Sequence, residues 1–124
     1  WRVNVRTRTL KLEPIPPTWE RLGGRGLIAR ILLDEVPPEC EPLGPKNKLI
    51  FCNGLLTGHM LSSIDRLSVG GKSPLTGGYA SSSLGGHFTA EMKYAGLDSI
   101  ILEGISPRPA RSGPLQAARP ASAR

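Results

Sequence analysis

Hydrophobic and polar positions near the N-terminus alternate, which predicts extended structure. Apolar and polar residues alternate over residues 3–5 and again over residues 10–12, on either side of the polar segment 7–9. The polar segment predicts a turn, and residues 3–12 are therefore expected to form a hairpin. Prolines at positions 14, 16 and 17 end the strand region, because proline cannot donate to a sheet ladder.

Helical spacing of apolar residues occurs twice. The clearer case runs from residue 27 to residue 36, directly after the glycine-rich segment 23–26, and the prolines at 37 and 38 end it. The second predicted helix is shorter, and Gly96 is its expected C-terminal stop. Its apolar stripe consists of Phe88, Met92 and Ala95.

Two short apolar runs, residues 49–52 and 98–103, predict buried strands. Between them, residues 54–86 hold eight glycines, with short extended pieces such as residues 66–69. The chain of 124 residues suits one domain, and 15 glycines and 12 prolines favour loops and strands over a helix bundle. These features predict an α+β fold, a β-rich domain with one or two helices.

The net positive charge of the chain comes mainly from the C-terminal segment, residues 106–124. This segment holds four of the 16 basic residues and no acid, and the remaining 12 basic and 10 acidic residues nearly cancel. A nucleic-acid partner would depend on this tail, which has no aromatic residue to stack on bases, so we expect none. The Ser, Pro, Arg and Ala composition predicts that the tail is disordered, or that it is a frameshift product from about residue 108 onward.

The thiols and histidines show no pattern of metal ligands. Cys40 and Cys52 are far apart, and two thiols cannot complete a four-thiolate iron–sulfur site. We interpret them as reduced thiols of a cytoplasmic protein. His59 and His87 have no acid or cysteine at ligand spacing and are interpreted as surface histidines. No segment approaches the roughly 20 apolar residues of a membrane span, so no membrane partner is expected.

Two glycine motifs match nucleotide-binding patterns only in part. Residues 24–29 have the letters G-x-G-x-x-A, but no strand is predicted before them and no acid stands about 20 positions later. They are interpreted as a glycine turn that opens the helix, either without a ligand or in close approach to one. Residues 71–73 end like a P-loop, but Arg66 occupies the position of its first glycine.

The glycine-rich segment 54–86 has two readings that the residues alone leave open. Glycine permits positive φ and close approach of the backbone to a ligand, and successive amides can form an anion nest. Arg66, Lys72 and Lys93 add positive charge around it. The segment is either a surface for a planar, phosphate-bearing cofactor or part of a turn-rich β domain without a ligand.

Ordered sequence blocks resemble a known family more specifically than any single motif. The blocks are residues 22–27, 34–38, 42–50, 54–58, 72–77, 85–88, 91–96 and 100–104. Together they resemble the N-terminal domain of the aldehyde:ferredoxin oxidoreductase family. The resemblance covers about residues 2–105, so residues 1–105 are expected to be an incomplete tungstopterin-binding domain.

The resemblance implies a function for a much longer protein. Family members oxidise aldehydes to carboxylic acids at a tungsten held by two pterin dithiolenes, and a [4Fe–4S] cluster passes the electrons to ferredoxin. The β-rich N-terminal domain is the base for this cofactor, and later domains supply the cluster ligands. This stretch alone is expected to be inactive, and the full-length protein to bind ferredoxin or a similar carrier and to be a homo-oligomer. The alternatives are a fragment of a tungsten benzoyl-CoA reductase subunit and a non-catalytic remnant of a truncated gene.

Three residues acquire roles by the resemblance. Arg66 stands at the pterin-contacting arginine of the family, and Gly85 at a glycine that contacts the cofactor. Ser83 stands where the best-known members have Asn, whose backbone carbonyl helps to hold a Mg²⁺ between the pterin phosphates. The expected cofactors are therefore tungstopterin and Mg²⁺, with the [4Fe–4S] ligands outside this chain.

Overall fold

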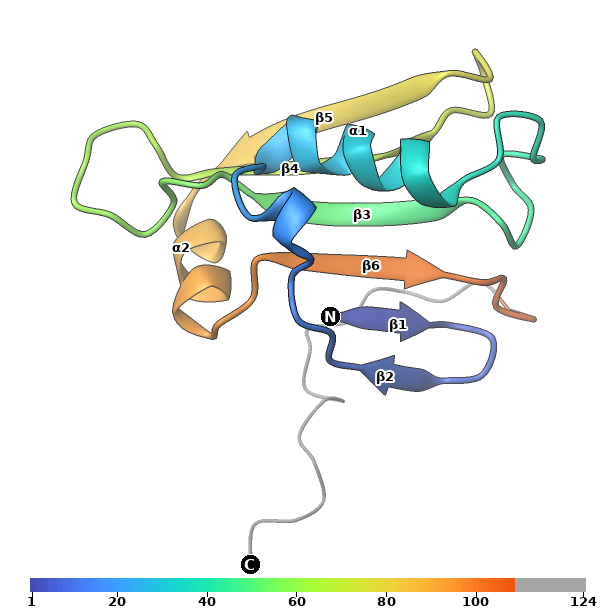
Figure 1. The fold of residues 1–124 in the computed structure, drawn as a ribbon, viewed down its shortest axis with the longest axis horizontal. Helices are drawn as coiled ribbons and strands as arrows, with labels where there is room; N and C mark the ends of the chain where they lie inside the picture. The colour runs from blue at the N-terminus through green and yellow to red at the C-terminus, as the bar shows by residue number, and fades with distance from the viewer. Residues whose placement is uncertain (109–124) are drawn as a thin grey trace, which may run out of the picture.

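The computed structural model describes residues 1–108, which form one six-stranded mixed sheet with two α-helices (Figure 1). The predicted α+β fold is confirmed. The expectations for the tail concern residues that lie almost entirely outside the described ones. The elements are β1 Arg2–Asn4, β2 Thr9–Lys11, the 3-10 turn η1 Pro17–Trp19, α1 Gly24–Glu35, β3 Lys48–Asn53, β4 Arg66–Lys72, β5 Tyr79–Gly85, α2 His87–Tyr94 and β6 Ser99–Glu103.

The strand order in the sheet is β2-β1-β6-β3-β4-β5. The predicted N-terminal hairpin is present, with Val3 opposite Leu10. β1 runs parallel to β6, and every other neighbouring pair is antiparallel. The two apolar runs of the sequence, now β3 and β6, lie side by side at the centre, where both faces of a sheet can be buried.

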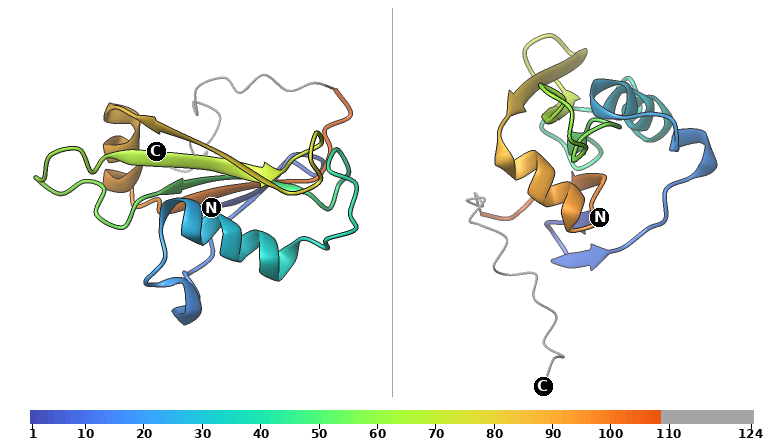
Figure 2. Two further views of the ribbon diagram at one scale, coloured as in Figure 1. Left: turned by 90° about the horizontal axis from the view of Figure 1, so that it is seen from above. Right: turned by 90° about the vertical axis from the view of Figure 1, so that its left-hand side faces the viewer.

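α1 covers one face of the sheet and forms the first core cluster. Ile28 and Ile31 are fully buried against Ile50 and Cys52 of β3. Burial of such side chains stabilises the fold by roughly 1.5–3 kcal/mol each. Figure 2 shows α1 along one side of the sheet and α2 at one end of the strands. The helix predicted from apolar spacing is therefore confirmed.

α2 belongs to a second cluster, which includes Leu67 of β4 and Ile100 of β6. Met92 is buried as its spacing predicts, but Phe88 is 50% exposed and the fully buried Thr89 takes its place. The predicted apolar stripe is thus wrong at Phe88 and also at Ala95, which is exposed and directly follows α2. A helix of eight residues is oriented by its connections to β5 and β6, so that spacing alone does not determine which face is buried.

β5 is the strand that the hydrophobic pattern did not reveal. All seven of its residues are exposed, and it pairs with β4 along its whole length, from Arg66 opposite Gly85 to Lys72 opposite Tyr79. It is an edge strand held by backbone hydrogen bonds, so its serines need no apolar alternation. The position of β5 places the last part of the glycine-rich segment, residues 77–86, at one edge of the sheet.

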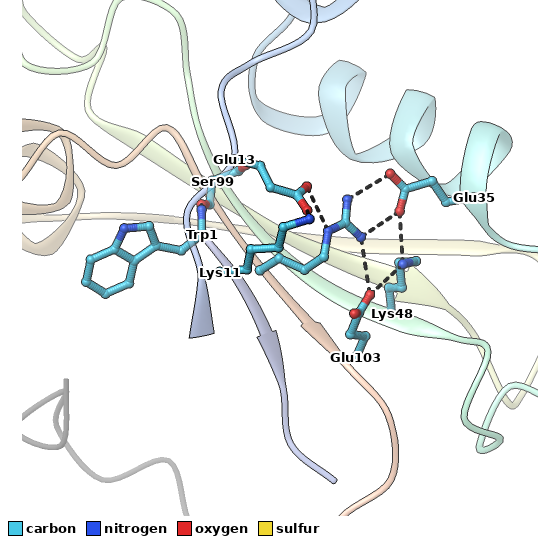
Figure 3. A network of polar contacts seen from close by, with 8 residues as sticks. Trp1, Lys11, Glu13, Glu35, Lys48, Ser99 and Glu103 are labelled. Atoms are coloured by element: carbon cyan, nitrogen blue, oxygen red, sulfur yellow. Dashed lines mark hydrogen bonds and ion pairs between the residues drawn. The ribbon is translucent and has the colours of Figure 1, made fainter. Parts of the chain in front are cut away.

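A network of ion pairs joins β1 to the end of α1 and to the centre of the sheet (Figure 3). The two Nη atoms of Arg2 each donate a hydrogen bond to one carboxylate oxygen of Glu35, at 2.8 and 2.9 Å. The same guanidinium also forms ion pairs with Glu13 and Glu103. Lys48 bridges Glu103 and Glu35 at 2.7 and 2.9 Å. Arg2 and Lys48 are only 17% and 11% exposed, so this network is screened less than surface pairs.

We expect this network to make folding sensitive to acid. The hydrogen bonds from Arg2 lower the pKa of Glu35, so between its folded pKa and the ordinary value of 4.5 the unfolded chain binds more protons. The contribution of Glu35 to the free energy of unfolding is therefore fully present above about pH 4.5, and it is lost as the pH decreases through the folded pKa of this residue. At pH 7, Glu35→Gln should cost roughly 1–2 kcal/mol, between the values of exposed and buried pairs.

Urea unfolding of the chain, followed by circular dichroism between pH 3 and pH 7, measures this effect. Glu35→Gln should flatten the pH dependence, whereas Glu39→Gln, an exposed glutamate outside the network, should leave it unchanged. Identical pH slopes for the parent chain and Glu35→Gln would contradict the prediction.

Candidate functional site

The three residues that the family resemblance singled out come together at one end of the β4–β5 hairpin. Arg66 begins β4 and lies directly opposite Gly85, which ends β5. Ser83 lies opposite Ser68, and their Oγ atoms are 3.5 Å apart. Residues two apart in a strand share a face of the sheet, so these positions lie on the same face.

That face is the one covered further along by α1. A Cβ on Gly70, two residues beyond Ser68, would lie 2.9 Å from the Ile28 side chain. Ser68 itself lies close to Gly24, where α1 begins. The helix thus covers the far end of the hairpin, and Arg66 and Gly85 remain exposed at the near end.

A pocket of about 370 Å³ opens at this near end. Its lining consists of Ser63, Asp65, Arg66, Gly85, Gly86 and His87. Within residues 1–108, Arg66 takes part in none of the ion pairs. An exposed guanidinium with unused donors can form in-plane hydrogen bonds to a phosphate or another acceptor.

The backbone at Gly85 does not need glycine for its own packing. A Cβ there would meet only the Asp65 carbonyl oxygen, at 3.6 Å, an ordinary contact. In contrast, a Cβ on Gly71 would lie 2.6 Å from the Lys48 carbonyl oxygen. Glycine is therefore required by the fold at position 71, whereas at position 85 it leaves space open toward the pocket.

The other positive charges of the glycine-rich segment have partners within the chain. Lys72 Nζ donates to the carbonyl oxygens of Pro38 and Cys40, and Lys93 forms an ion pair with Asp98. Lys72 therefore holds the loop after α1, which is a structural role. Of the three cations that the sequence placed around this segment, only Arg66 is without a charged or carbonyl partner among residues 1–108.

The two glycine motifs that partly match nucleotide-binding patterns lie in other structural contexts than those patterns require. The element before Gly24 is the 3-10 turn η1, not a strand, and Gly24 has a φ of +53° at the start of α1. Gly71 and Lys72 lie within β4, not in a loop before a helix. Neither segment has the strand–turn–helix context that a nucleotide site requires.

The thiols lie away from the pocket. Burial raises the pKa of Cys52 to about 11, so it is a neutral thiol in the first core cluster. Cys40 is also buried, and the two cysteines are not joined by a disulfide. Among residues 1–108, no group of three or more His, Cys, Asp or Glu side chains could hold a metal ion. Neither α-helix in that range has the length and apolarity that a bilayer crossing requires.

His87 is exposed, as its interpretation as a surface histidine predicts, but it also begins α2 and lines the pocket together with Arg66 and Gly85. The sequence analysis gives no role in this site to His87, nor to the lining residues Ser63 and Asp65. The available signal for His87 was its position directly after the Gly85–Gly86 pair. Neither apolar spacing nor metal-ligand spacing predicts that an exposed residue of this kind lines a pocket.

Comparison with known proteins identifies the family. The model of the family described as "Aldehyde ferredoxin oxidoreductase, N-terminal domain" matches residues 1–111. The chain belongs to this family. Within the family, it is 44% identical over 112 residues to the tungsten-containing aldehyde ferredoxin oxidoreductase of Thermococcus kodakarensis and 43% identical to that of Pyrococcus furiosus.

Other relatives of this domain have different names. Over 90 residues the chain is 38% identical to a WOR-like subunit of an aliphatic sulfonate oxidoreductase from Pyrococcus furiosus. It also superimposes, with a TM-score of 0.81 and 42% identity over 86% of its length, on a chain of a solved benzoyl-coenzyme A reductase complex, the active-site complex BamBC with 1,5-dienoyl-CoA.

The chain spans only a small part of these proteins. It covers 18% of the two aldehyde ferredoxin oxidoreductases, 14% of the sulfonate oxidoreductase subunit and 16% of the benzoyl-CoA reductase chain. The matched region is 87% of this chain for the aldehyde enzymes. The comparisons therefore define an N-terminal domain that occurs in relatives named for different activities.

Proposed function

We propose that this chain forms part of the tungstopterin-binding base of an aldehyde ferredoxin oxidoreductase. The observation that carries the proposal is the convergence of Arg66, Ser83 and Gly85 at one end of the β4–β5 hairpin. The relatives named for tungsten support it, since 87% of the chain matches them. The sheet supplies a rigid platform, which holds a cofactor more precisely than a loop does.

The residues present fit such a cofactor. A pterin with a phosphate is planar and anionic and needs hydrogen-bond donors as well as close approach to a backbone. The pocket offers an Arg66 guanidinium without an ion pair in residues 1–108, and Gly85 leaves space that a side chain would fill. The exposed serines of β5 supply further polar groups.

Each residue has a distinct role in this proposal. Arg66 donates hydrogen bonds to acceptors of the pterin or its phosphate, which is a charge-assisted interaction. Gly85 permits close approach. The Ser83 backbone carbonyl helps to hold Mg²⁺ between the two pterin phosphates, a contact that does not depend on the side chain. When bound, the tungsten centre would supply the two-electron oxidation of an aldehyde, with water as the source of the added oxygen atom.

The remaining parts of the proposed enzyme lie outside this chain. In this reaction the aldehyde and one water molecule yield a carboxylic acid, two protons and two electrons, and the electrons need an acceptor. A [4Fe–4S] cluster, with cysteine ligands supplied elsewhere, passes the electrons to ferredoxin or a similar iron–sulfur carrier. We further propose a cytoplasmic enzyme that can form homo-oligomers. Residues 1–108 alone position the cofactor and carry out no complete reaction.

A benzoyl-CoA reductase-type subunit is the second candidate. The TM-score of 0.81 and 42% identity to the benzoyl-CoA reductase chain support it about as strongly as the aldehyde relatives support the first. The base domain is shared, and the substrate pocket is formed mostly by other parts of the protein. A non-catalytic remnant of a truncated gene is the third candidate.

The test is made on the complete polypeptide that carries this sequence. We expect stoichiometric tungsten and pterin in the purified protein, together with aldehyde-dependent reduction of ferredoxin. Ring reduction of benzoyl-CoA without aldehyde oxidation would favour the second candidate. A folded polypeptide without tungsten, purified from cells grown with tungstate, would favour the remnant and overturn the proposed function.

A further inference from the structure

His87 and Arg66 line the same pocket although they come from different elements. Arg66 begins β4, and His87 begins α2, which follows the last residue of β5, Gly85, after the single residue Gly86. Both side chains are exposed. Among residues 1–108, neither takes part in an ion pair or a side-chain hydrogen bond that would occupy its donors.

From this geometry we propose that His87 is a further cofactor-binding residue, which donates a hydrogen bond to the same anionic group that Arg66 holds. The proposal rests on the proposed function and names the kind of group at this pocket, a phosphate oxygen of the pterin. It makes the pocket a two-sided clamp, to which β4 contributes Arg66 and α2 contributes His87.

The charge balance of the pocket favours an anion. Asp65 is its one acidic side chain, and its Oδ1 already accepts a hydrogen bond from the Gly58 backbone N–H at 3.0 Å. The lining therefore combines a permanent cation, an imidazole that can donate from either ring nitrogen, and one acid that is partly engaged by the chain itself. A phosphate accepts several hydrogen bonds at once, as this set of donors requires.

The backbone around His87 is arranged to keep its side chain at the pocket. Gly86 has a φ of +123°, which residues with a side chain rarely adopt, and this conformation turns the chain from β5 into α2. The Thr89 N–H and Oγ both point back to the Gly86 carbonyl oxygen, at 3.3 and 3.1 Å, and Thr89 is fully buried. The turn that carries His87 is therefore held in place by hydrogen bonds from a fully buried threonine of α2.

The second histidine of the chain provides a matched control. His59 lies in the loop between β3 and β4 and is exposed like His87, but it is not among the residues that line the pocket. If His87 were only a surface histidine, replacing either residue would have the same small effect.

The test compares His87→Phe, His87→Gln and His59→Phe in the complete polypeptide purified with its tungstopterin. Phe keeps the size of the ring and removes the donor, whereas Gln keeps a donor on a similar reach. Tungsten per polypeptide is measured by elemental analysis during incubation in dilute urea, and circular dichroism confirms that each variant stays folded. His87→Phe should lose tungsten about 10-fold faster, the value of roughly one hydrogen bond to a charged group.

Each outcome decides between the two proposals. His87→Gln should retain most of the tungsten, and His59→Phe should match the parent protein. If Arg66→Ala loses tungsten but folded His87→Phe retains it, the role of His87 is overturned and the proposed function stands. If folded Arg66→Ala and His87→Phe both retain tungsten like the parent, the cofactor role of this pocket fails, whereas a parent protein without tungsten would refute the proposed function. Equal loss in His87→Phe and His87→Gln would also overturn the hydrogen-bond role.

Discussion

Replacing Gly85 by Val in the complete polypeptide should yield a folded protein that retains little tungsten. A Cβ at position 85 meets only an ordinary contact within the chain, and valine suits an extended strand, so that the fold tolerates the change. The added side chain would instead occupy the space next to Arg66 into which the cofactor is proposed to fit. The measurement is tungsten per polypeptide after purification.

Arg66→Ala tests the same contact by a different route. It removes a charge-assisted hydrogen bond worth roughly 1.5–3 kcal/mol, which corresponds to about a 10- to 150-fold loss of affinity. The cofactor affinity of Arg66→Lys should lie between those of the parent and Arg66→Ala, because lysine keeps the charge but not the planar arrangement of donors. Ser83→Ala should have little effect if Ser83 contributes only its backbone carbonyl.

Ser82→Val is the control for a valine in this strand. Ser82 is exposed in β5 like Gly85, but it pairs with Val69 and points to the opposite face of the sheet. We expect it to retain tungsten. Folded Gly85→Val and Arg66→Ala proteins with undiminished tungsten would contradict the cofactor role of this end of the hairpin.

Gly71→Ala should destabilise the chain strongly, whereas Gly85→Ala should not. The new methyl group at position 71 would lie 2.6 Å from the Lys48 carbonyl oxygen, so that β3 and β4 must move apart. The movement would also strain the Asn47 side chain, which accepts from the Lys72 N–H at 3.1 Å and donates to the Lys72 carbonyl at 2.9 Å. Overpacking of this kind costs roughly 1–3 kcal/mol.

Urea unfolding of the two variants measures this difference directly. Both are glycine-to-alanine changes in the same hairpin, so the change in unfolded-chain entropy is similar and slightly favours both variants. Gly71→Ala should lower the free energy of unfolding by about 2 kcal/mol relative to Gly85→Ala. Equal stabilities would show that β3 and β4 can separate at Gly71 without cost.

The local sequence pattern predicted the helices and strands that are stabilised by their own side chains. Apolar spacing from residue 27 to 36 predicted α1, the runs 49–52 and 98–103 predicted β3 and β6, and the alternation of residues 3–12 predicted the hairpin. Gly96, with a φ of +77°, ends α2 as expected. In these cases the side chains that stabilise an element lie within that element, so spacing alone is informative.

The family resemblance indicated Arg66, Ser83 and Gly85 but gave no geometry for them. That Arg66 faces Gly85 follows from the register of β4 and β5, and β5 itself is a strand of exposed residues that pairs through its backbone. Backbone hydrogen bonds carry no side-chain signature, so pattern analysis does not detect such a strand.

The sequence by itself therefore determined the family, the α+β class and the main elements, and only the tertiary structure decided which distant residues meet. Arg2 forms ion pairs with Glu35 and Glu103, which are 33 and 101 positions away in the sequence. His87 lines the same pocket as Arg66 because α2 follows β5 at that edge of the sheet. Contacts of this kind depend on how the sheet is ordered and how the short helix is turned. Both are set by the packing of the whole core, which no local window of sequence contains.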